Sequence, residues 1–210
     1  MGLDVRAFPL FEVRALDWKL VPPEDVDALL LGSANAVRHG GPALERYRGL
    51  PAYVVGEATA VVARKAGLKV IAIGKGGMQQ VLDRLAPGHS RLLRLAGRER
   101  LDLTLPERAT VTTREVYASE ALPFPPELAR LLADPAVVLL HSGEAAAHFA
   151  KGCTENGIAR AHLALAAIGP RVAARAGTGW AALRSASEPS DAALLALAFQ
   201  MCQDTADGFP

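Results

Sequence analysis

The chain has 210 residues, 50% of them hydrophobic and 21% charged, which is ordinary for a globular protein with a substantial core. Its 23 Lys and Arg residues nearly balance its 22 Asp and Glu residues, so the sequence does not predict a nucleic-acid binder that relies on long-range charge. The longest apolar runs are far shorter than the ~18–20 residues that span a bilayer, and Arg6 interrupts any apolar start. We therefore expect a cytoplasmic protein with neither a nucleic-acid nor a membrane partner.

The first half of the chain alternates short β-rich runs with helical stretches. An extended segment is predicted at 5–13, followed by strands at 26–31, 52–55, 68–73 and 90–95. One helix is predicted from Ala34, another at 57–66, and a third up to about Arg84. Gly67 suits the end of the second helix, because glycine adopts the left-handed conformation found there without strain.

The second half repeats this order of elements. An extended segment is predicted at 109–118, followed by strands at 136–141, 163–168 and 180–184. Helices are predicted up to about Cys153, at 171–176 and at 190–201. Three residue pairs recur at an offset of about 110 positions, namely Ser33 with Ser142, Gly56 with Gly169, and Gly67 with Gly177. The matching order of strands and helices favours an internal duplication over chance.

Strands that alternate with helices indicate parallel sheets covered by helices on both faces. The duplication therefore predicts an α/β protein with two similar parallel-sheet domains. The two extended segments predict a two-stranded linker, with an inserted domain at 12–113 and a discontinuous domain made of 1–11 and 114–210. We expect an interdomain cleft.

Small hydrogen-bonding residues follow four of the predicted strands, at the ends where open parallel sheets bind their ligands. Each group opens a helix, whose free N–H groups and positive dipole end suit carboxylates or phosphates. The candidate binding residues are Ser33, Ala34, Asn35, Gly56, Thr59, Ser142, Gly143, Gly169 and Pro170. The simpler alternative is that the two serines only cap their own helices.

Three further residues are candidates for the site. Arg98 follows a strand and a glycine, where its guanidinium could bind a carboxylate through two hydrogen bonds, although a solvated loop charge explains it equally well. Arg171 opens a helix, where a cation opposes the dipole, and this points weakly to a nearby anion. Tyr117 lies in the second linker segment, where its phenol could donate a hydrogen bond into the cleft or its ring could simply be half-buried.

Stronger catalytic signals are not found in the sequence. Residues 74–77 lack the spacing of a phosphate-binding loop, and neither a Gly-x-Gly-x-x-Gly nor a Gly-x-Ser-x-Gly motif occurs. Cys153 and Cys202 have no metal-ligand spacing, so both are predicted to be small core residues and no metal site is expected.

Several segments, taken in order, carry a resemblance that covers nearly the whole chain. They are Asp27–Val37, Tyr53–Ala60 with Ala66–Gly67, Glu115–Tyr117, Val138–Gly143, Ala167–Ala173 with Gly177, and Ser187–Leu194. Each resembles a motif of the uroporphyrinogen-III synthase family. The resemblance implies two flavodoxin-like domains. It also implies closure of the linear tetrapyrrole hydroxymethylbilane, with inversion of its last pyrrole ring, to uroporphyrinogen III and water in haem biosynthesis.

The resemblance also implies how this lyase would work. It needs no cofactor and no metal, acts as a monomer, and takes a small-molecule tetrapyrrole as its partner. The strand-end residues given above would line the substrate site, and Tyr117 would assist departure of the hydroxyl group. Many substrate carboxylates suit a site of backbone amides, hydroxyls and a few arginines.

Two features depart from the family. Its members usually begin with a further strand and helix that carry an Arg-Pro pair, and without them we expect the discontinuous domain to have a smaller sheet and exposed apolar surface. Gly32 and Val172 stand where the family has threonine, so two hydroxyl groups are lacking.

The alternatives to a synthase are a two-lobed small-anion-binding or regulatory module without catalysis and, more remotely, a flavoprotein.

Overall fold

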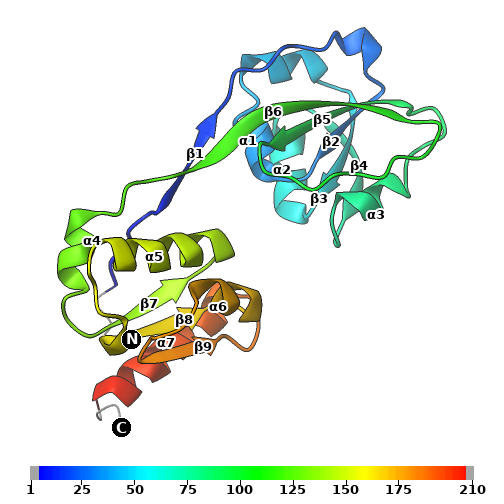
Figure 1. Ribbon diagram of the computed structural model, residues 1–210. Helices are drawn as coiled ribbons and strands as arrows, with labels where there is room; N and C mark the ends of the chain where they lie inside the picture. The colour runs from blue at the N-terminus through cyan, green and yellow to red at the C-terminus, as the bar shows by residue number, and fades with distance from the viewer. Residues whose placement is uncertain (1–4, 207–210) are drawn as a thin grey trace. The chain divides into compact units, whose positions relative to one another are not determined.

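The computed structural model describes residues 5–206, which separate into two compact units (Figure 1). The inserted unit is Val13–Glu120, and the discontinuous unit combines Met1–Glu12 with Ala121–Pro210. The strands form two separate sheets, one with six strands and one with three.

The inserted unit contains a six-stranded sheet in the order β1-β6-β5-β2-β3-β4. Its strands are β1 (Phe11–Ala15), β2 (Ala28–Leu31), β3 (Pro51–Val55), β4 (Lys69–Gly74), β5 (Arg91–Gly97) and β6 (Thr110–Ala121). Its helices are α1 (Ala34–Arg38), α2 (Glu57–Lys65) and α3 (Met78–Leu82), with 3-10 helices at Pro23–Asp25 and Pro42–Tyr47. Strand β2 pairs in parallel with β3 and with β5, and the pairs β3–β4 and β5–β6 are also parallel, as the alternation of strands and helices predicts.

Alternate residues of β2 point to opposite faces of this sheet. Leu29 and Leu31 pack in the same cluster as Ala60 of α2, whereas Leu30 packs with Met78 of α3. All five side chains are buried. Helices thus cover both faces of the sheet, which explains why β2 is an uninterrupted apolar run.

A charged contact joins β2 to β5 at the amino-terminal end of the two strands. The Asp27 carboxylate accepts hydrogen bonds from the backbone N–H groups of Ser90, at 3.0 Å, and Arg91, at 2.8 Å. The Arg91 guanidinium also donates to it, at 2.8 Å. The Arg91 side chain is the main reason that the pKa of Asp27 lies below its usual range, and the two backbone hydrogen bonds add to the effect.

The discontinuous unit contains a parallel sheet in the order β7-β8-β9. Its strands are β7 (Ala136–Leu140), β8 (Leu163–Ala167) and β9 (Ala182–Ser185). Its helices are α4 (Pro126–Leu131), α5 (Gly143–Glu155), α6 (Pro170–Ala176) and α7 (Asp191–Ala206), with a 3-10 helix at Arg160–His162. No helix within residues 5–206 is long and apolar enough to cross a membrane.

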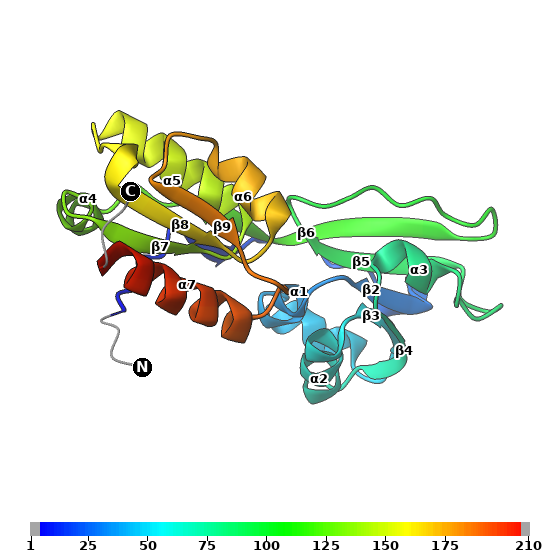
Figure 2. The same ribbon diagram turned by 90° about the horizontal axis from the view of Figure 1, so that it is seen from below.

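Both faces of this smaller sheet are also covered. Figure 2 shows α5 and α6 on one face and α7 on the other. Leu163 and Leu165 of β8 pack with Phe149 of α5, whereas Ala164 packs with Leu194 of α7. The same alternation of side chains therefore builds the core in both units.

Several elements differ from the prediction. Helix α4 was not predicted, although Pro126 at its first position is compatible with a helix start, because that position needs no N–H donor. Strand β6 continues to Ala121, beyond the predicted 109–118. The extended segment at 5–13 becomes a strand only at Phe11, after Pro9.

Among residues 5–206, strand β7 has a strand neighbour on one side only, which is β8. A groove of about 1000 Å³ follows its other edge, and all five residues of β7 line it. Apolar side chains from both faces of the unit complete its walls, among them Leu10, Leu128, Leu132, Phe149, Leu195 and Ala198. Leu195 is 41% exposed, so the smaller sheet leaves apolar surface open along this edge.

Candidate functional site

Parallel pairing brings several strand ends of the inserted unit to one edge of its sheet. Leu31 of β2 pairs with Val54 of β3 and with Leu95 of β5, so the segments that follow these strands lie beside one another. A cavity of about 300 Å³ opens there, and we call it the strand-end pocket. Its polar and flexible lining includes Ser33, Gln79, Arg94, Gly97, Arg100 and Tyr117.

Ser33 lines this pocket and also caps a helix. Its hydroxyl oxygen accepts a hydrogen bond from the backbone N–H of Asn35, at 3.2 Å, as the N-cap of α1. Ala34 is the first residue of α1, and the side-chain oxygen of Asn35 accepts from Arg38 at 3.2 Å. The capping alternative therefore holds for Ser33, while its place in the pocket leaves it available to a ligand as well.

The segment after β3 offers backbone rather than hydroxyl groups. Gly56 precedes α2 with a φ of +79°, which favours glycine, and no side chain caps the first N–H groups of the helix. Thr59, in the first turn, is only 4% exposed. Val172 occupies the matching position of α6 and packs against the core of its own unit. Side chains at this position thus face inward, and neither Gly56 nor Thr59 lines the strand-end pocket.

Tyr117 lies on β6 beside the end of β5. Its register partner is Gly97, where an added β-carbon would lie 2.8 Å from the phenol ring and 3.0 Å from the hydroxyl oxygen. The ring also lies 6.2 Å, centroid to centroid, from the ring of His39. Gly97 therefore leaves the space that the phenol occupies at the pocket.

The hydroxyl group of Tyr117 differs from those of the other two tyrosines. Tyr47 donates to the carbonyl oxygen of Val21 at 2.6 Å, and the hydroxyl of Tyr53 accepts from the N–H of Ala86 at 2.8 Å. Among residues 5–206, the hydroxyl of Tyr117 has no such partner. It is therefore available to donate a hydrogen bond to a bound molecule.

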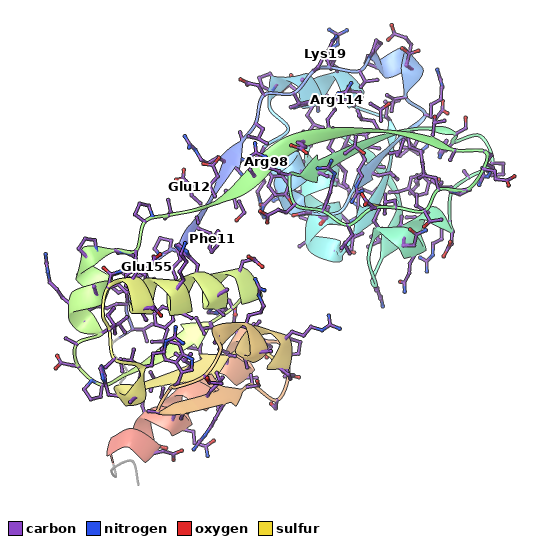
Figure 3. All side chains as sticks on the ribbon, viewed as in Figure 1. Phe11, Glu12, Lys19, Arg98, Arg114 and Glu155 are labelled. Carbon is purple, nitrogen blue, oxygen red and sulfur yellow. The ribbon has the colours of Figure 1, made fainter. Side chains whose placement is uncertain are left out.

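Arg98 is exposed and does not line the pocket, although it follows β5 as predicted (Figure 3). Its Nε lies 3.7 Å from Oε2 of Glu115. Arg100 does line the pocket, and its Nη1 donates to Oε1 of Glu115 at 2.7 Å. The hydrogen bond from Arg100 is the main cause that lowers the pKa of Glu115 from its ordinary value.

A second guanidinium reaches the pocket from within the sheet. Arg94 lies in the interior of β5, and its Nη2 donates to the carbonyl oxygen of Leu101 at 2.9 Å. Burial, and after it the nearby charge of Arg100, lowers the pKa of Arg94 from its ordinary value. The sequence-based reasoning did not include Arg94 or Arg100 among the site residues. The signal for Arg94 was present, because it interrupts the apolar run of a buried strand.

The discontinuous unit presents a second set of strand ends. Leu140 of β7 pairs with Ala167 of β8, so the segments that follow these strands are neighbours. Ser142 caps α5, its hydroxyl oxygen accepting from the N–H of Ala145 at 3.1 Å, and Gly143 is the first helical residue. Here too the capping alternative holds, and Ser142 remains exposed.

The second strand end of this unit starts α6. Gly169 is the N-cap without a side-chain hydrogen bond, and Pro170 occupies the first turn. Arg171 is exposed beside them. An ion pair of 3.0 Å between Arg175 and Glu144 joins α6 to α5 near these segments. The unit thus offers mainly backbone groups and one serine hydroxyl at its strand ends.

The two cysteines of the chain are not grouped with other potential metal ligands in the described part of the structure. Cys153 is fully buried, and burial raises the pKa of its thiol to about 11, so the thiol is protonated at neutral pH. Within residues 5–206, no group of three or more His, Cys, Asp and Glu side chains is arranged to hold a metal ion.

Parallel sheets covered on both faces, with polar and basic groups collected at strand ends, define an α/β protein of the class that binds small molecules at that edge. A family model described as uroporphyrinogen-III synthase HemD matches residues 1–196. The chain belongs to the uroporphyrinogen-III synthase family, whose members are cyclising lyases of haem biosynthesis.

Solved structures share the fold. The uroporphyrinogen-III synthetase of Helicobacter pylori is similar at 20% identity and a TM-score of 0.66, over 91% of this chain and 91% of that one. A mutant uroporphyrinogen III synthase of Thermus thermophilus is similar at 17% identity and a TM-score of 0.52, over 94% of this chain and 88% of that one. No curated protein matches the chain.

Proposed function

We propose that this chain itself closes hydroxymethylbilane to uroporphyrinogen III, with inversion of the last pyrrole ring and release of water, and that Tyr117 is its catalytic residue. The observation that carries the proposal is the phenol of Tyr117, which lines the strand-end pocket and whose hydroxyl group has no hydrogen-bond partner among residues 5–206. The comparisons give no support to a non-catalytic anion-binding module.

Tyr117 supplies the proton that the leaving group needs. The phenol donates a hydrogen bond, and then the proton, to the hydroxyl of the substrate, which departs as water. Inversion of the last ring then needs two new carbon–carbon bonds and the loss of one. The cationic methylene carbon bonds to the substituted α-carbon of the last pyrrole, the bond from that carbon to the neighbouring ring's methylene breaks, and this methylene bonds to the free α-carbon. The proton lost from that α-carbon, as the pyrrole regains its aromaticity, restores the phenol. The products are the macrocycle and water, so the step balances without a redox partner.

The rest of the site has to select one isomer. The linear substrate closes unaided to the wrong isomer, so the enzyme has to favour the transition state that leads to isomer III. Each tenfold increase in the ratio of isomer III to isomer I requires about 1.4 kcal/mol of stabilisation of the first transition state relative to the second. Backbone N–H groups and hydroxyls at the strand ends suit the carboxylates of the substrate. The residues proposed to bind them are Ser33, Ala34, Asn35, Gly56, Thr59, Arg98, Ser142, Gly143, Gly169, Pro170 and Arg171, with Thr59 acting through its backbone.

The test compares Tyr117→Phe with Tyr53→Phe. We expect the first change to slow formation of isomer III about 100-fold, the lower range for a lost general acid, with an unchanged free energy of unfolding. The second change removes a hydroxyl that accepts from Ala86, so it should lower that free energy by about 1 kcal/mol and leave kcat unchanged. Chromatographic separation of isomers I and III measures the first effect, and urea unfolding measures the second.

Two outcomes would contradict the proposal at different points. If the wild-type chain yields only isomer I at the uncatalysed rate, the proposed function is wrong. If the wild type yields isomer III and Tyr117→Phe has the same kinetics, the function stands and Tyr117 is a packing residue.

We also infer that the two units are flavodoxin-like domains with a cleft between them, and that the protein is a monomer located in the cytoplasm. Light scattering on the purified protein measures its mass, and a mass of twice that of the chain would contradict the monomer.

A further inference from the structure

Arg94 stands at a position where a charge is costly. It belongs to β5, which lies between β6 and β2 inside the six-stranded sheet. Its neighbours along the strand, Leu93 and Leu95, are fully buried, and Leu92 is 2% exposed. Alternation places Arg94 on the same face as Leu92, which packs against α3. Arg94 itself is partly buried, so other contacts have to replace part of the hydration of its guanidinium.

The protein supplies little compensation of its own. Among residues 5–206, no carboxylate forms an ion pair with Arg94, and its one hydrogen bond is to the carbonyl oxygen of Leu101. Asp102 is attractive but exposed, and it makes no direct contact with the guanidinium. Arg100 adds repulsion, and its own charge is already paired with Glu115. Positive charge at this point therefore exceeds what the neighbouring residues neutralise.

The arrangement leaves donors and space for a ligand. A guanidinium has five N–H donors in a planar fork, and the bond to Leu101 uses one of them. Both Arg94 and Arg100 line the strand-end pocket, as do Ser33 and Tyr117. Another part of the pocket lining is held in place, because Gln79 exchanges hydrogen bonds of 2.8 and 3.0 Å with the backbone of Thr104. A carboxylate is the anion that a guanidinium fork matches best in such a site.

We propose that Arg94, assisted by Arg100, binds one carboxylate of the tetrapyrrole substrate in the strand-end pocket and so sets how that substrate enters. This inference rests on the proposed function. It gives the interior arginine of β5 a role that its single bond to Leu101 does not explain, since a neutral amide donor would serve that bond as well. Arg94 is a binding residue, so its removal should affect substrate affinity more than the rate of the bound complex.

The test measures kcat and KM for isomer III formation in the variants Arg94→Gln and Arg94→Lys. We expect Arg94→Gln to raise KM at least tenfold with kcat changed less than twofold, because a charge-assisted contact to the substrate is lost. Arg94→Lys keeps the positive charge but not the planar guanidinium, so its KM should lie between that of the wild type and that of Arg94→Gln. The matched control is Arg46→Gln, an exposed arginine of the same unit, which should leave both constants unchanged.

A second measurement separates binding from folding and from the reaction. Titration with uroporphyrin III, followed by its own fluorescence, should give a dissociation constant that rises for Arg94→Gln by the same factor as KM. Urea unfolding shows whether the variant is folded under these conditions, and Arg94→Lys keeps the test valid if Arg94→Gln is not.

The results distinguish a failure of the proposed carboxylate site from a failure of the proposed function. Equal KM and equal uroporphyrin affinity in wild type and folded Arg94→Gln would overturn the carboxylate site while leaving the proposed function intact. A wild type that forms only isomer I would overturn the proposed function, and the uroporphyrin titration would still test the carboxylate site by itself.

Discussion

Each unit contains an apolar strand that is followed by a helix and pairs in parallel with the next strand, namely β2 in the inserted unit and β7 in the discontinuous unit. The two units differ in what lies on the other side of that strand. In the inserted unit, β2 has β3 on one side and β5 on the other, and β6 follows β5. In the described part of the discontinuous unit, β7 has β8 as its single strand neighbour, and the groove of about 1000 Å³ lies on its other side. Both strands are apolar runs of the same kind, so the position of a strand in a sheet depends on which neighbours the chain supplies.

The two units also differ in the side chains that they present at their strand ends. Arg94, Arg100 and Tyr117 come from β5, the loop after it and β6, which lie on the side of β2 that has no counterpart in the discontinuous unit. The strand ends of that second unit offer Ser142 and backbone groups instead. The strand ends common to both units thus supply backbone N–H groups and a serine hydroxyl, and the additional strands of the inserted unit supply Arg94, Arg100 and Tyr117.

Hydrogen exchange should show the largest difference between the units. In a parallel sheet, alternate N–H groups of a strand point to either side, so those of β7 that point away from β8 have no strand partner. We expect them to exchange about a thousandfold faster than the N–H groups of β2, which has neighbours on both sides. Uniform protection along β7 would contradict an open edge.

Gly152→Ala should destabilise the discontinuous unit by about 2 kcal/mol. Alanine normally favours a helix over glycine by about 1 kcal/mol, but a β-carbon at this position of α5 collides with the ring of Phe124. That ring packs against Phe149, which is 1% exposed, and cannot easily retreat. Urea unfolding followed by Trp180 fluorescence in a Trp18→Phe background measures the change.

The control for this prediction is Lys151→Ala, one residue earlier on the exposed side of α5. It should change the free energy of unfolding by less than about 0.5 kcal/mol. A stabilised Gly152→Ala would show that Phe124 moves aside and that helix propensity decides the outcome.

Asp27→Asn should have a smaller effect, confined to the inserted unit. It removes the charge that accepts from Ser90 and Arg91, so we expect a loss of about 1 kcal/mol at pH 7. Because the pKa of Asp27 is lowered in the folded state, its contribution is complete above the ordinary carboxyl pKa of about 4 and is lost as the pH falls below it. The variant should therefore lose less stability than wild type between about pH 5 and pH 2.

Trp18 fluorescence in a Trp180→Phe background reports this unit. Parallel pH profiles for Asp27→Asn and wild type would contradict the role given to the carboxylate.

The sequence contained enough to predict most strands but not their order. β2, β3, β7 and β8 are apolar runs that end near glycine or serine, and their local pattern predicts them. That β5 would lie beside β2 depends on long-range packing, which no local pattern contains. The site followed the same division: Ser33 and Tyr117 were predicted from position in the chain, whereas the joint placement of Arg94 and Arg100 depends on how the loop after β5 folds back.

The glycine opposite Tyr117 restricts how this site can vary. A β-carbon at Gly97 would lie within 3.0 Å of the phenol ring, so a substitution of the glycine displaces the side chain of Tyr117 although the tyrosine itself is unchanged. A substitution at Gly97 therefore requires the side chain of Tyr117 to move or to be replaced. A designer who wishes to transplant the phenol to another scaffold has to carry the empty position on the adjoining strand along with it.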